Sequence, residues 1–339
     1  MSEALVSVIL PAYNAEKNIG ECIRSLQDQT YQNIEIIVID DGSTDGTAGR
    51  IKACAMADGR VLYKYQENTG PGPARNRGLA LSCGEWIMFV DADDRVDQDI
   101  VKVLYDAAIE SRADLICAGW TDVMPVGSRE KRRIPRIPKA QFLRTAKECR
   151  DTFMDMLFED VLTAPTRKLY SAKIIRQHGV LFPPLRRSED IVFNYRYFDH
   201  VTSCVVLDRS LYDYSMLEAA DMLAKIKSDY YEAVKILCHD LEALHRKWGY
   251  APSGPQFQKV YNYCQDYAML CIEANVLRGE PIDDILNDIE IQRIVRLSRP
   301  VKPFNRMLGK CYARKNKWLL PYLVYARIKL RDVKHFFGK

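Results

Sequence analysis

The sequence predicts an α/β domain with a mostly parallel, twisted sheet, followed by an α-helical C-terminal domain. Three observations predict this fold. Short apolar runs alternate with helical patterns over the first 120 residues, polar residues follow three of those runs, and helical patterns alone remain after residue 215. The 339 residues suffice for two domains, since a domain takes roughly 150 residues.

The first 120 residues contain five short apolar runs that predict buried strands, at 5–10, 34–39, 61–65, 85–90 and 115–118. Apolar residues recur at helical spacing between them, over 15–28, 44–57, 73–82 and 97–111. In the first of these helices, one face carries Ile19, Cys22, Ile23 and Leu26. Strands that alternate with helices of this length indicate βαβ units and a mostly parallel sheet.

The pattern is less regular between 121 and 215. A basic segment with two prolines, 127–139, predicts an excursion at the edge of the sheet. Helices are expected at 146–158, 171–177 and 189–199, and strands at 203–207 and 211–214. The helices expected after that are 219–247, 256–277, 281–297 and 303–337, the last interrupted by Pro321.

We therefore expect two domains, 1–215 and 216–339. The first divides where the regular pattern ends, into the halves 1–120 and 121–215. The second is entirely helical in its pattern.

Composition excludes several classes of protein. No apolar run approaches the ~20 residues of a membrane-spanning helix. The N-terminal residues MSEALVSVILPAYN lack a basic region before the apolar run, so a strand is expected there rather than a signal peptide. Ten dispersed cysteines form no Cys-x-x-Cys pair, which favours a reduced cytoplasmic protein without zinc.

The positive charge is concentrated at the C-terminus. Residues 300–339 hold eleven Lys or Arg and one acid, a formal charge of +10. Because the whole chain carries +4, residues 1–299 carry −6. Such a tail suits an anionic surface. A nucleic-acid partner is disfavoured because the body is net acidic and the charged face of the tail lacks interleaved aromatic residues.

The tail also has an amphipathic pattern. Its apolar residues recur at a spacing of four and three, at Leu319, Leu323, Ala326, Leu330, Val333 and Phe337. A basic amphipathic helix can lie on an anionic membrane, so we expect peripheral contact with the inner face of the membrane through 318–337. The alternatives are a helix packed on its own domain and a contact between subunits, which would make the chain a homo-oligomer through 216–339.

Polar residues follow three predicted strands, where an open α/β sheet binds its ligands. Asp91 and Asp93 come directly after a buried strand and supply hard oxygen ligands that suit Mg²⁺ or Mn²⁺ on phosphates. An isolated Asp-x-Asp is more often a turn and a helix cap, but the second acidic strand end at 40–45 favours a metal. There the carboxylate of Asp40 can accept the imide N–H of a pyrimidine, and Tyr13 can stack on its ring.

A glycine-containing loop, 68–76, leads into the third helix. It does not match Gly-x-Gly-x-x-Gly, because Arg75 follows Ala74, so the dinucleotide fingerprint is absent. Two runs, VSVILPAYNAEKNIGECIRSLQDQTYQNIEIIVIDDGSTDGT and NTGPGPARNRGLALSCGEWIMFVDADD, together resemble the nucleotide-sugar-binding domain of glycosyltransferase family 2, of GT-A fold. The resemblance covers residues 6–118 and continues more loosely through Lys-Leu-Tyr at 168–170 and Ser-Glu-Asp at 188–190.

The resemblance implies a site for a UDP-sugar formed by Pro11, Tyr13, Asp40, Asp41, Asn68, Arg75, Asp91 and Ala92. It implies Mn²⁺ or Mg²⁺ as cofactor, held by Asp91, Asp93 and Asp94. It also implies Asp190 as the catalytic base, with Glu189 as the alternative. Residues 1–120 would then be the nucleotide-binding half, and 121–215 the half that binds the acceptor and carries the base. The helical domain would contact the acceptor, a membrane or a second copy of the chain. From the residues alone, Ser188, Glu189 and Asp190 are explained equally well by capping of a helix N-terminus.

The resemblance further implies an inverting hexosyl- or N-acetylhexosaminyltransferase of the bacterial cell-surface polysaccharide type. Its acceptor would be a glycan or a lipid-linked molecule. A processive synthase is disfavoured, because Gln-x-x-Arg-Trp and membrane-spanning segments are missing from the sequence. The alternative is a non-catalytic scaffold or binding protein of the same fold in a glycan assembly complex.

Overall fold

The computed structural model describes residues 3–126, 130–185, 188–216, 230–300, 303–316, 318–324 and 326. The chain divides into two compact units, Met1–Glu218 and Ala219–Lys339. The sequence predicted the division between residues 215 and 216. Within the described residues, none of the helices is both long enough and apolar enough to span a bilayer.

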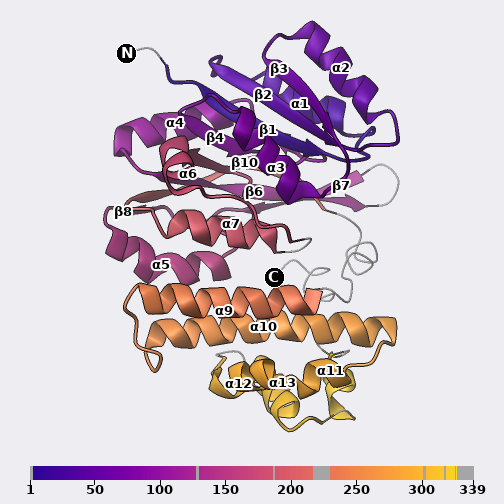
Figure 1. The fold of residues 1–339 in the computed structure, drawn as a ribbon, viewed down its shortest axis with the longest axis vertical. Coiled ribbons are helices and arrows are strands. Elements are labelled where there is room, and N and C mark those ends of the chain that lie inside the picture. Colours follow the sequence, from indigo (N-terminus) through magenta and orange to yellow (C-terminus); the bar gives the residue numbers. More distant parts are fainter. Residues whose placement is uncertain are drawn as a thin grey trace. The chain divides into compact units, whose positions relative to one another are not determined.

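One ten-stranded sheet forms the first unit, in the order β3-β2-β1-β4-β9-β6-β10-β5, with β7 beside β6 and β8 beside β10 (Figure 1). Its strands are β1 Val6–Ala12, β2 Ile34–Asp41, β3 Val61–Gln66, β4 Trp86–Phe89, β5 Arg95–Val96, β6 Leu115–Val126, β7 Glu130–Arg136, β8 Gln141–Leu143, β9 Lys168–Ser171 and β10 Cys204–Ser215. Strands β1 to β4, β6 and β10 share one direction, and the other four run against them. The expected α/β class with a mostly parallel sheet is confirmed.

Seven helices are described in this unit: α1 Ile19–Gln27, α2 Thr47–Ala57, α3 Pro71–Leu81, α4 Ile100–Ser111, α5 Ala146–Phe158, α6 Ala172–His178 and α7 Glu189–Phe198. Side chains of β1 alternate between the two faces of the sheet. Val6, Val8 and Leu10 belong to the core that α1 and α4 share with the sheet, whereas Ile9 faces α3. The apolar face predicted for α1 is the buried one.

The structure differs from the predicted elements in the second half of the sheet. The two strands expected at 203–207 and 211–214 are one strand, β10, whose register with β6 shifts at Ser210. Polar residues at 208–210 interrupt its apolar pattern. Strand β9 was missed, because four residues that begin with a lysine show no recognisable period. It pairs antiparallel with both β4 and β6.

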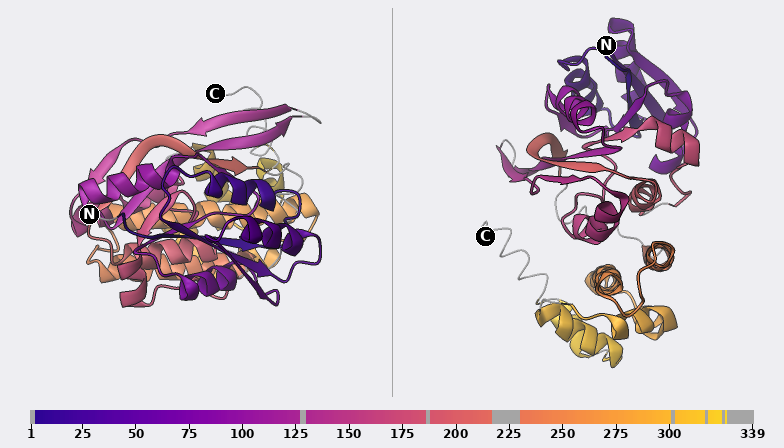
Figure 2. Two further views of the ribbon diagram at one scale, coloured as in Figure 1. Left: turned by 90° about the horizontal axis from the view of Figure 1, so that it is seen from above. Right: turned by 90° about the vertical axis from the view of Figure 1, so that its left-hand side faces the viewer.

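The basic segment expected as an excursion forms the edge strand β7, which pairs antiparallel with the twelve-residue β6. In the view from above, these two strands extend together along the side of the unit (Figure 2, left). The hairpin gives the sheet a basic edge, because Arg132, Arg133 and Arg136 lie on β7.

The second unit is helical, with α9 Tyr230–Lys247, α10 Pro255–Arg278, α11 Asp283–Asn287, α12 Ile289–Leu297 and α13 Pro303–Ala313. The single helix predicted at 281–297 is two helices, because the Asp288 side chain accepts the N–H groups of Glu290 and Ile291 and so caps α12. A buried carboxylate, Glu242 of α9, binds Arg293 of α12 at 2.6 Å. Residues 217–229, which include part of the predicted first helix, lie outside the described residues.

Most of the predicted amphipathic tail also lies outside the described residues. In the part that is described, Leu320 and Val324 are buried, whereas Trp318 is 87% exposed and Tyr322 75% exposed. Leu319, expected on the apolar face, is 44% exposed. In this described part, the helical unit therefore packs against the side of Leu320 and Val324, and the side of Leu319, predicted to face a membrane, stays partly exposed.

Replacement of Gly78 tests how closely α3 must approach the sheet. A Cβ atom at this position would lie 2.3 Å from Cγ2 of Ile9 on β1. We expect Gly78→Ala to destabilise the protein by roughly 1–3 kcal/mol, because the contact forces α3 away from the sheet.

The matched control is Gly49→Ala on α2, where a Cβ would meet nothing within 4 Å. That change should stabilise the helix by up to about 1 kcal/mol. Urea unfolding of both variants checks the pair, and equal effects would contradict the close approach.

Candidate functional site

The polar strand ends meet at one edge of the sheet. Strand β1 lies between β2 and β4, and Ala12 at its end pairs with Asp40 at the end of β2. Asp91 lies two residues after the end of β4. The predicted nucleotide and metal residues of the first half therefore come from neighbouring elements.

Asp40 and Asp41 are both buried beneath this edge. The Asp40 carboxylate accepts the backbone N–H of Ser43 at 2.9 Å and the Tyr63 hydroxyl at 3.1 Å. These bonds fix the turn after β2. A carboxylate oxygen accepts more than one hydrogen bond, so contact of Asp40 with a base stays a prediction.

The carboxylate of Asp41 anchors the loop that leads into α3. One oxygen accepts the Gln66 amide at 2.7 Å and the Thr69 N–H at 3.0 Å, and the other accepts the Gly70 N–H at 2.8 Å. Gly70 has a φ of 98°, which a residue with a Cβ rarely adopts. Because Asp41 is 3% exposed and holds three donors, its geometry fits a positioning role better than the predicted contact with nucleotide.

The other predicted nucleotide residues at this edge of the sheet differ in exposure. Tyr13 is 53% exposed and Asn68 is exposed, Pro11 is half-buried, and Ala92 is buried. The exposed ring of Tyr13 is able to meet a flat ligand.

Arg75 of α3 connects the two halves of the site. Its side chain is 4% exposed, and its guanidinium lies 5.3 Å from the ring centre of Phe182. Nη2 donates to Asp91 at 2.8 Å and Nη1 to Asp190 at 2.7 Å, with Glu189 at 3.7 Å. Burial opposes the charge of Arg75, but Asp190, Asp91 and Glu189 raise its pKa overall.

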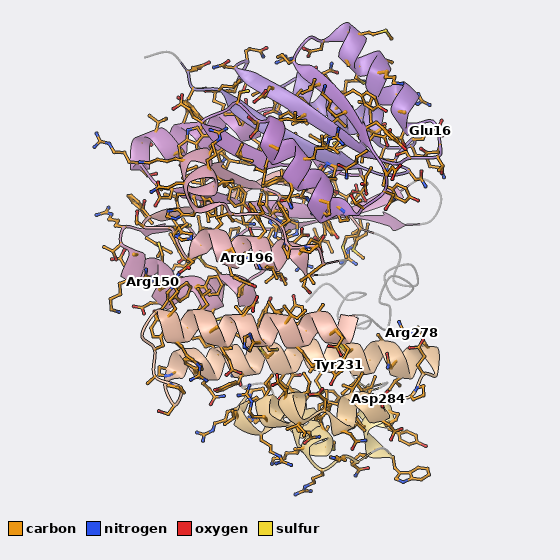
Figure 3. The ribbon with its side chains drawn as sticks, in the orientation of Figure 1. Glu16, Arg150, Arg196, Tyr231, Arg278 and Asp284 are labelled. Carbon is orange, nitrogen blue, oxygen red and sulfur yellow. The ribbon has the colours of Figure 1, made fainter. Side chains whose placement is uncertain are left out.

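Helix α7 is held in place by a buried aromatic and amide network. Phe193 stacks on Phe182 at 4.0 Å between ring centres, and the amide of Asn194 donates to Leu162 O at 2.7 Å and accepts the Tyr170 hydroxyl at 2.7 Å. On the exposed side of the same helix lies Arg196 (Figure 3). The network fixes the start of α7, where Asp190 lies.

The loop before α7 is tied to α3 by a reciprocal pair of hydrogen bonds. The Asn76 amide donates to Phe182 O at 2.9 Å and accepts Phe182 N–H at 2.9 Å. Ser188, at the N-terminus of α7, has a φ of 60° and makes no side-chain cap bond. The alternative explanation by capping therefore lacks its Ser188 bond, although Glu189 and Asp190 do lie in the first turn of α7.

The side chain of Asp190 is 31% exposed and lines a cavity of about 920 Å³ that Asp91 also lines. Burial, together with the carboxylates of Glu189 and Asp91, raises its pKa to about 7 against the opposing effect of Arg75. A carboxylate of that pKa is suited to take a proton near neutral pH.

The turn 91–94 is fixed from strand β10. The Tyr212 hydroxyl donates to Asp94 at 2.6 Å and accepts the backbone N–H of Asp91 at 3.2 Å, and the Ser215 N–H donates to the other Asp94 oxygen at 2.7 Å. Burial, with the carboxylates of Asp91 and Asp93, raises the pKa of Asp94. Because both oxygens of Asp94 are engaged and the residue is 1% exposed, it fits the role of a support for the turn rather than the predicted metal ligand.

Asp91 and Asp93 are suited to bind a divalent cation whose other ligands come from a bound phosphate. Among the described residues, no group of three or more His, Cys, Asp or Glu side chains converges as a metal site. The side chain of Asp91 is 30% exposed and Asp93 is exposed. Mg²⁺ typically takes one or two carboxylates and completes its shell with phosphates and water, so two acids at this turn suffice.

Sequence reasoning missed Asn76 and Tyr212 as positioning residues. Asn76 directly follows Arg75 in the same motif, which is a usable signal. Tyr212 lies in the strand predicted at 211–214, and nothing in the sequence joins it to a turn 118 residues away.

Comparison with known proteins finds a match to one family in the first half of the chain. The family model described as Glycosyl transferase family 2 matches residues 7–164. The glycosyltransferase GlyA of Streptococcus pneumoniae is 44% identical over 34% of this chain and 16% of its own length. The glycosyltransferase EpsH of Bacillus subtilis, itself named as putative, is 30% identical over 63% of this chain and 61% of its own. The chain thus spans less than two thirds of either relative.

A solved structure extends the likeness in fold to nearly the whole chain. TarS 1–349 of S. aureus superposes with a TM-score of 0.59 at 20% identity, over 96% of this chain and 91% of that one. By sequence, the poly(ribitol-phosphate) beta-N-acetylglucosaminyltransferase TarS of Staphylococcus aureus is 28% identical over 71% of this chain and 42% of its own length. The structural likeness establishes a shared GT-A fold.

Replacement of Tyr212 tests the support of the turn. We expect Tyr212→Phe to destabilise the protein by about 1–3 kcal/mol, because a buried carboxylate oxygen and a backbone N–H lose their partner. Thermal unfolding measures the change. Tyr65→Phe, on a 53% exposed ring, is the control and should stay within about 0.5 kcal/mol; equal stability of both variants would contradict the assigned role.

Proposed function

We propose that this chain, which belongs to glycosyl transferase family 2 through residues 7–164, transfers a sugar from a UDP-sugar to a hydroxyl group. The acceptor is a cell-surface glycan or a lipid-linked molecule. The observation that carries the proposal is the pairing of Arg75 with both Asp91 and Asp190. It sets a candidate metal ligand and a candidate base in the wall of one cavity.

The comparisons support the class of donor. Structures of TarS 1–349 in complex with UDP and with UDP-GlcNAc share the fold of this chain, with TM-scores of 0.57 and 0.59. TarS is named as an N-acetylglucosaminyltransferase. These names favour a hexosyl or N-acetylhexosaminyl group as the sugar that is transferred here.

The proposed reaction is a single displacement that inverts the anomeric carbon. Asp190 takes the proton from the acceptor hydroxyl as that oxygen attacks, and Glu189 is the alternative base. Asp91 and Asp93 would hold Mg²⁺ or Mn²⁺, which supplies positive charge to the diphosphate as it leaves. Arg75 orients the two carboxylates, and the exposed Tyr13 and Asn68 bind the nucleotide.

We further propose that the protein works in the cytoplasm at the inner face of the membrane. The exposed Trp318 and Tyr322 support this placement, since both rings favour the level of lipid headgroups. Contact between copies through the helical unit is a separate proposal, which size measurement in solution tests.

The base assignment is tested by Asp190→Asn. We expect transfer to fall by about 10²–10⁴-fold, because a positioned general base contributes that much, while UDP still binds. Asp106→Asn, an exposed acid of α4 paired with Lys102, is the matched control and should keep full activity. Full activity of Asp190→Asn would overturn the assignment, and a larger loss in Glu189→Gln would transfer it to Glu189.

The metal and the donor are tested together with purified protein and a panel of UDP-, GDP-, dTDP- and CMP-sugars. With Mn²⁺ or Mg²⁺ present, we expect one UDP-sugar to bind and to hydrolyse slowly. Asp93→Ala or a chelator should weaken this binding at least about tenfold, since a carboxylate is lost from the cation, whereas Asp106→Ala should not. If no nucleotide sugar binds to folded protein, the scaffold alternative is favoured.

A further inference from the structure

The cavity at Asp91 and Asp190 continues beyond the residues of the proposed reaction. Its wall also contains Trp120, Arg136, Lys139, Arg167 and Tyr214. All of these residues belong to the first unit. The proposed reaction assigns no role to any of them.

Arg167 is the unusual group in this wall. It is 4% exposed, and its guanidinium lies over the indole of Trp120 at 3.9 Å from the ring centre. One nitrogen, Nη2, donates to the backbone oxygen of Asp160, and the buried Nε has no hydrogen-bond partner. Its φ of 55° is also uncommon for a residue with a side chain.

The nearby acids leave the charge of Arg167 without an ion pair. Asp122 binds Trp120 Nε1 and Arg136 Nε, each at 2.8 Å. Asp91 and Asp190 are shared with Arg75, as described above. Glu159 and Asp160 line the cavity too, and the Asp160 carboxylate favours the charge of Arg167 from a distance, but no ion pair of a carboxylate with Arg167 is found among the described residues.

A buried charge without a counterion is costly, and the cost is offset when a ligand supplies the opposite charge. The planar guanidinium binds two oxygens of one phosphate or carboxylate at the same time. The indole of Trp120 restrains the plane of that group. The arrangement is therefore built to receive an anion from the cavity.

We propose that Arg167 binds an anionic group of the acceptor, a phosphate or a carboxylate, next to the hydroxyl that receives the sugar. The inference rests on the proposed function, because it assigns the occupant of this part of the cavity as the acceptor.

Arg167 lies at a different part of the sheet from the residues predicted to bind the nucleotide. It directly precedes β9, which lies on the side of β4 away from β1 and β2. The predicted nucleotide residues come from β1, β2, the start of α3 and the turn after β4. The donor's diphosphate is the competing anion, and the experiment separates the two.

The test uses full-length protein with the donor site filled by UDP and Mg²⁺. Glucose, glucose 6-phosphate and glucuronic acid are then titrated, and binding is followed by NMR. We expect one or both anionic sugars to bind at least about tenfold more tightly than glucose, because charge-assisted hydrogen bonds are worth that much. A preference for the phosphate points to a phosphate-bearing acceptor, and a preference for glucuronic acid points to a uronic acid.

Arg167→Gln should reduce the affinity for the anionic sugar to that for glucose, without changing the affinity for UDP. Arg176→Gln is the matched control, since this exposed arginine also donates to backbone oxygens but lies outside the cavity wall. Arg167→Lys, which keeps the charge and loses the planar fork, should retain part of the preference and serves if Arg167→Gln does not fold.

The proposal is overturned if neither anionic sugar binds better than glucose, or if Arg167→Gln keeps the preference. It is also overturned if Arg167→Gln weakens UDP instead, because the anion is then the donor's diphosphate. If wild-type protein fails to bind UDP in these samples, the result counts against the proposed function. The same sugars are then titrated without UDP, and the preference for the anionic sugar still tests Arg167.

Discussion

One buried guanidinium holds the candidate site together. Asp91, Glu189 and Asp190 come from two distant parts of the chain, and their carboxylates would repel one another without a cation between them. Arg75 supplies that cation and reaches Asp91 and Asp190 with separate nitrogens. Its position in turn depends on the close approach of α3 to β1 at Gly78 and on the ring of Phe182 beneath the guanidinium.

The site is therefore set by contacts between segments far apart in the sequence. Arg75 and Asp190 are separated by 115 residues, and Asp94 and Ser215 by 121. Helix α3 holds the segment before α7 through Asn76, and β10 holds the turn after β4 through Tyr212. These contacts join the two halves of the sheet around the cavity.

The dependence on contacts between distant segments explains which parts of the fold and the site were predictable from the sequence. The first four strands and helices follow from apolar periodicity, and the meeting of the strand ends follows from parallel pairing. The antiparallel β9 was missed, because its pattern is too short to be recognised. The partners of Tyr212, Asn76 and Arg167 depend on register and on packing between elements, and no local pattern records them. Asp190 was located only through the resemblance, since its own segment indicates a helix cap equally well.

Burial separates the acids of the candidate site into two groups, which sequence alone does not distinguish. Asp40, Asp41 and Asp94 are almost fully buried, and backbone or hydroxyl donors occupy their oxygens. Asp91 and Asp190 keep about a third of their side chains exposed and share one arginine. A buried carboxylate must be satisfied within the protein, so the first group shapes the loops. The second group retains oxygens that face the cavity, and a cation, a proton and an acceptor are able to reach them there.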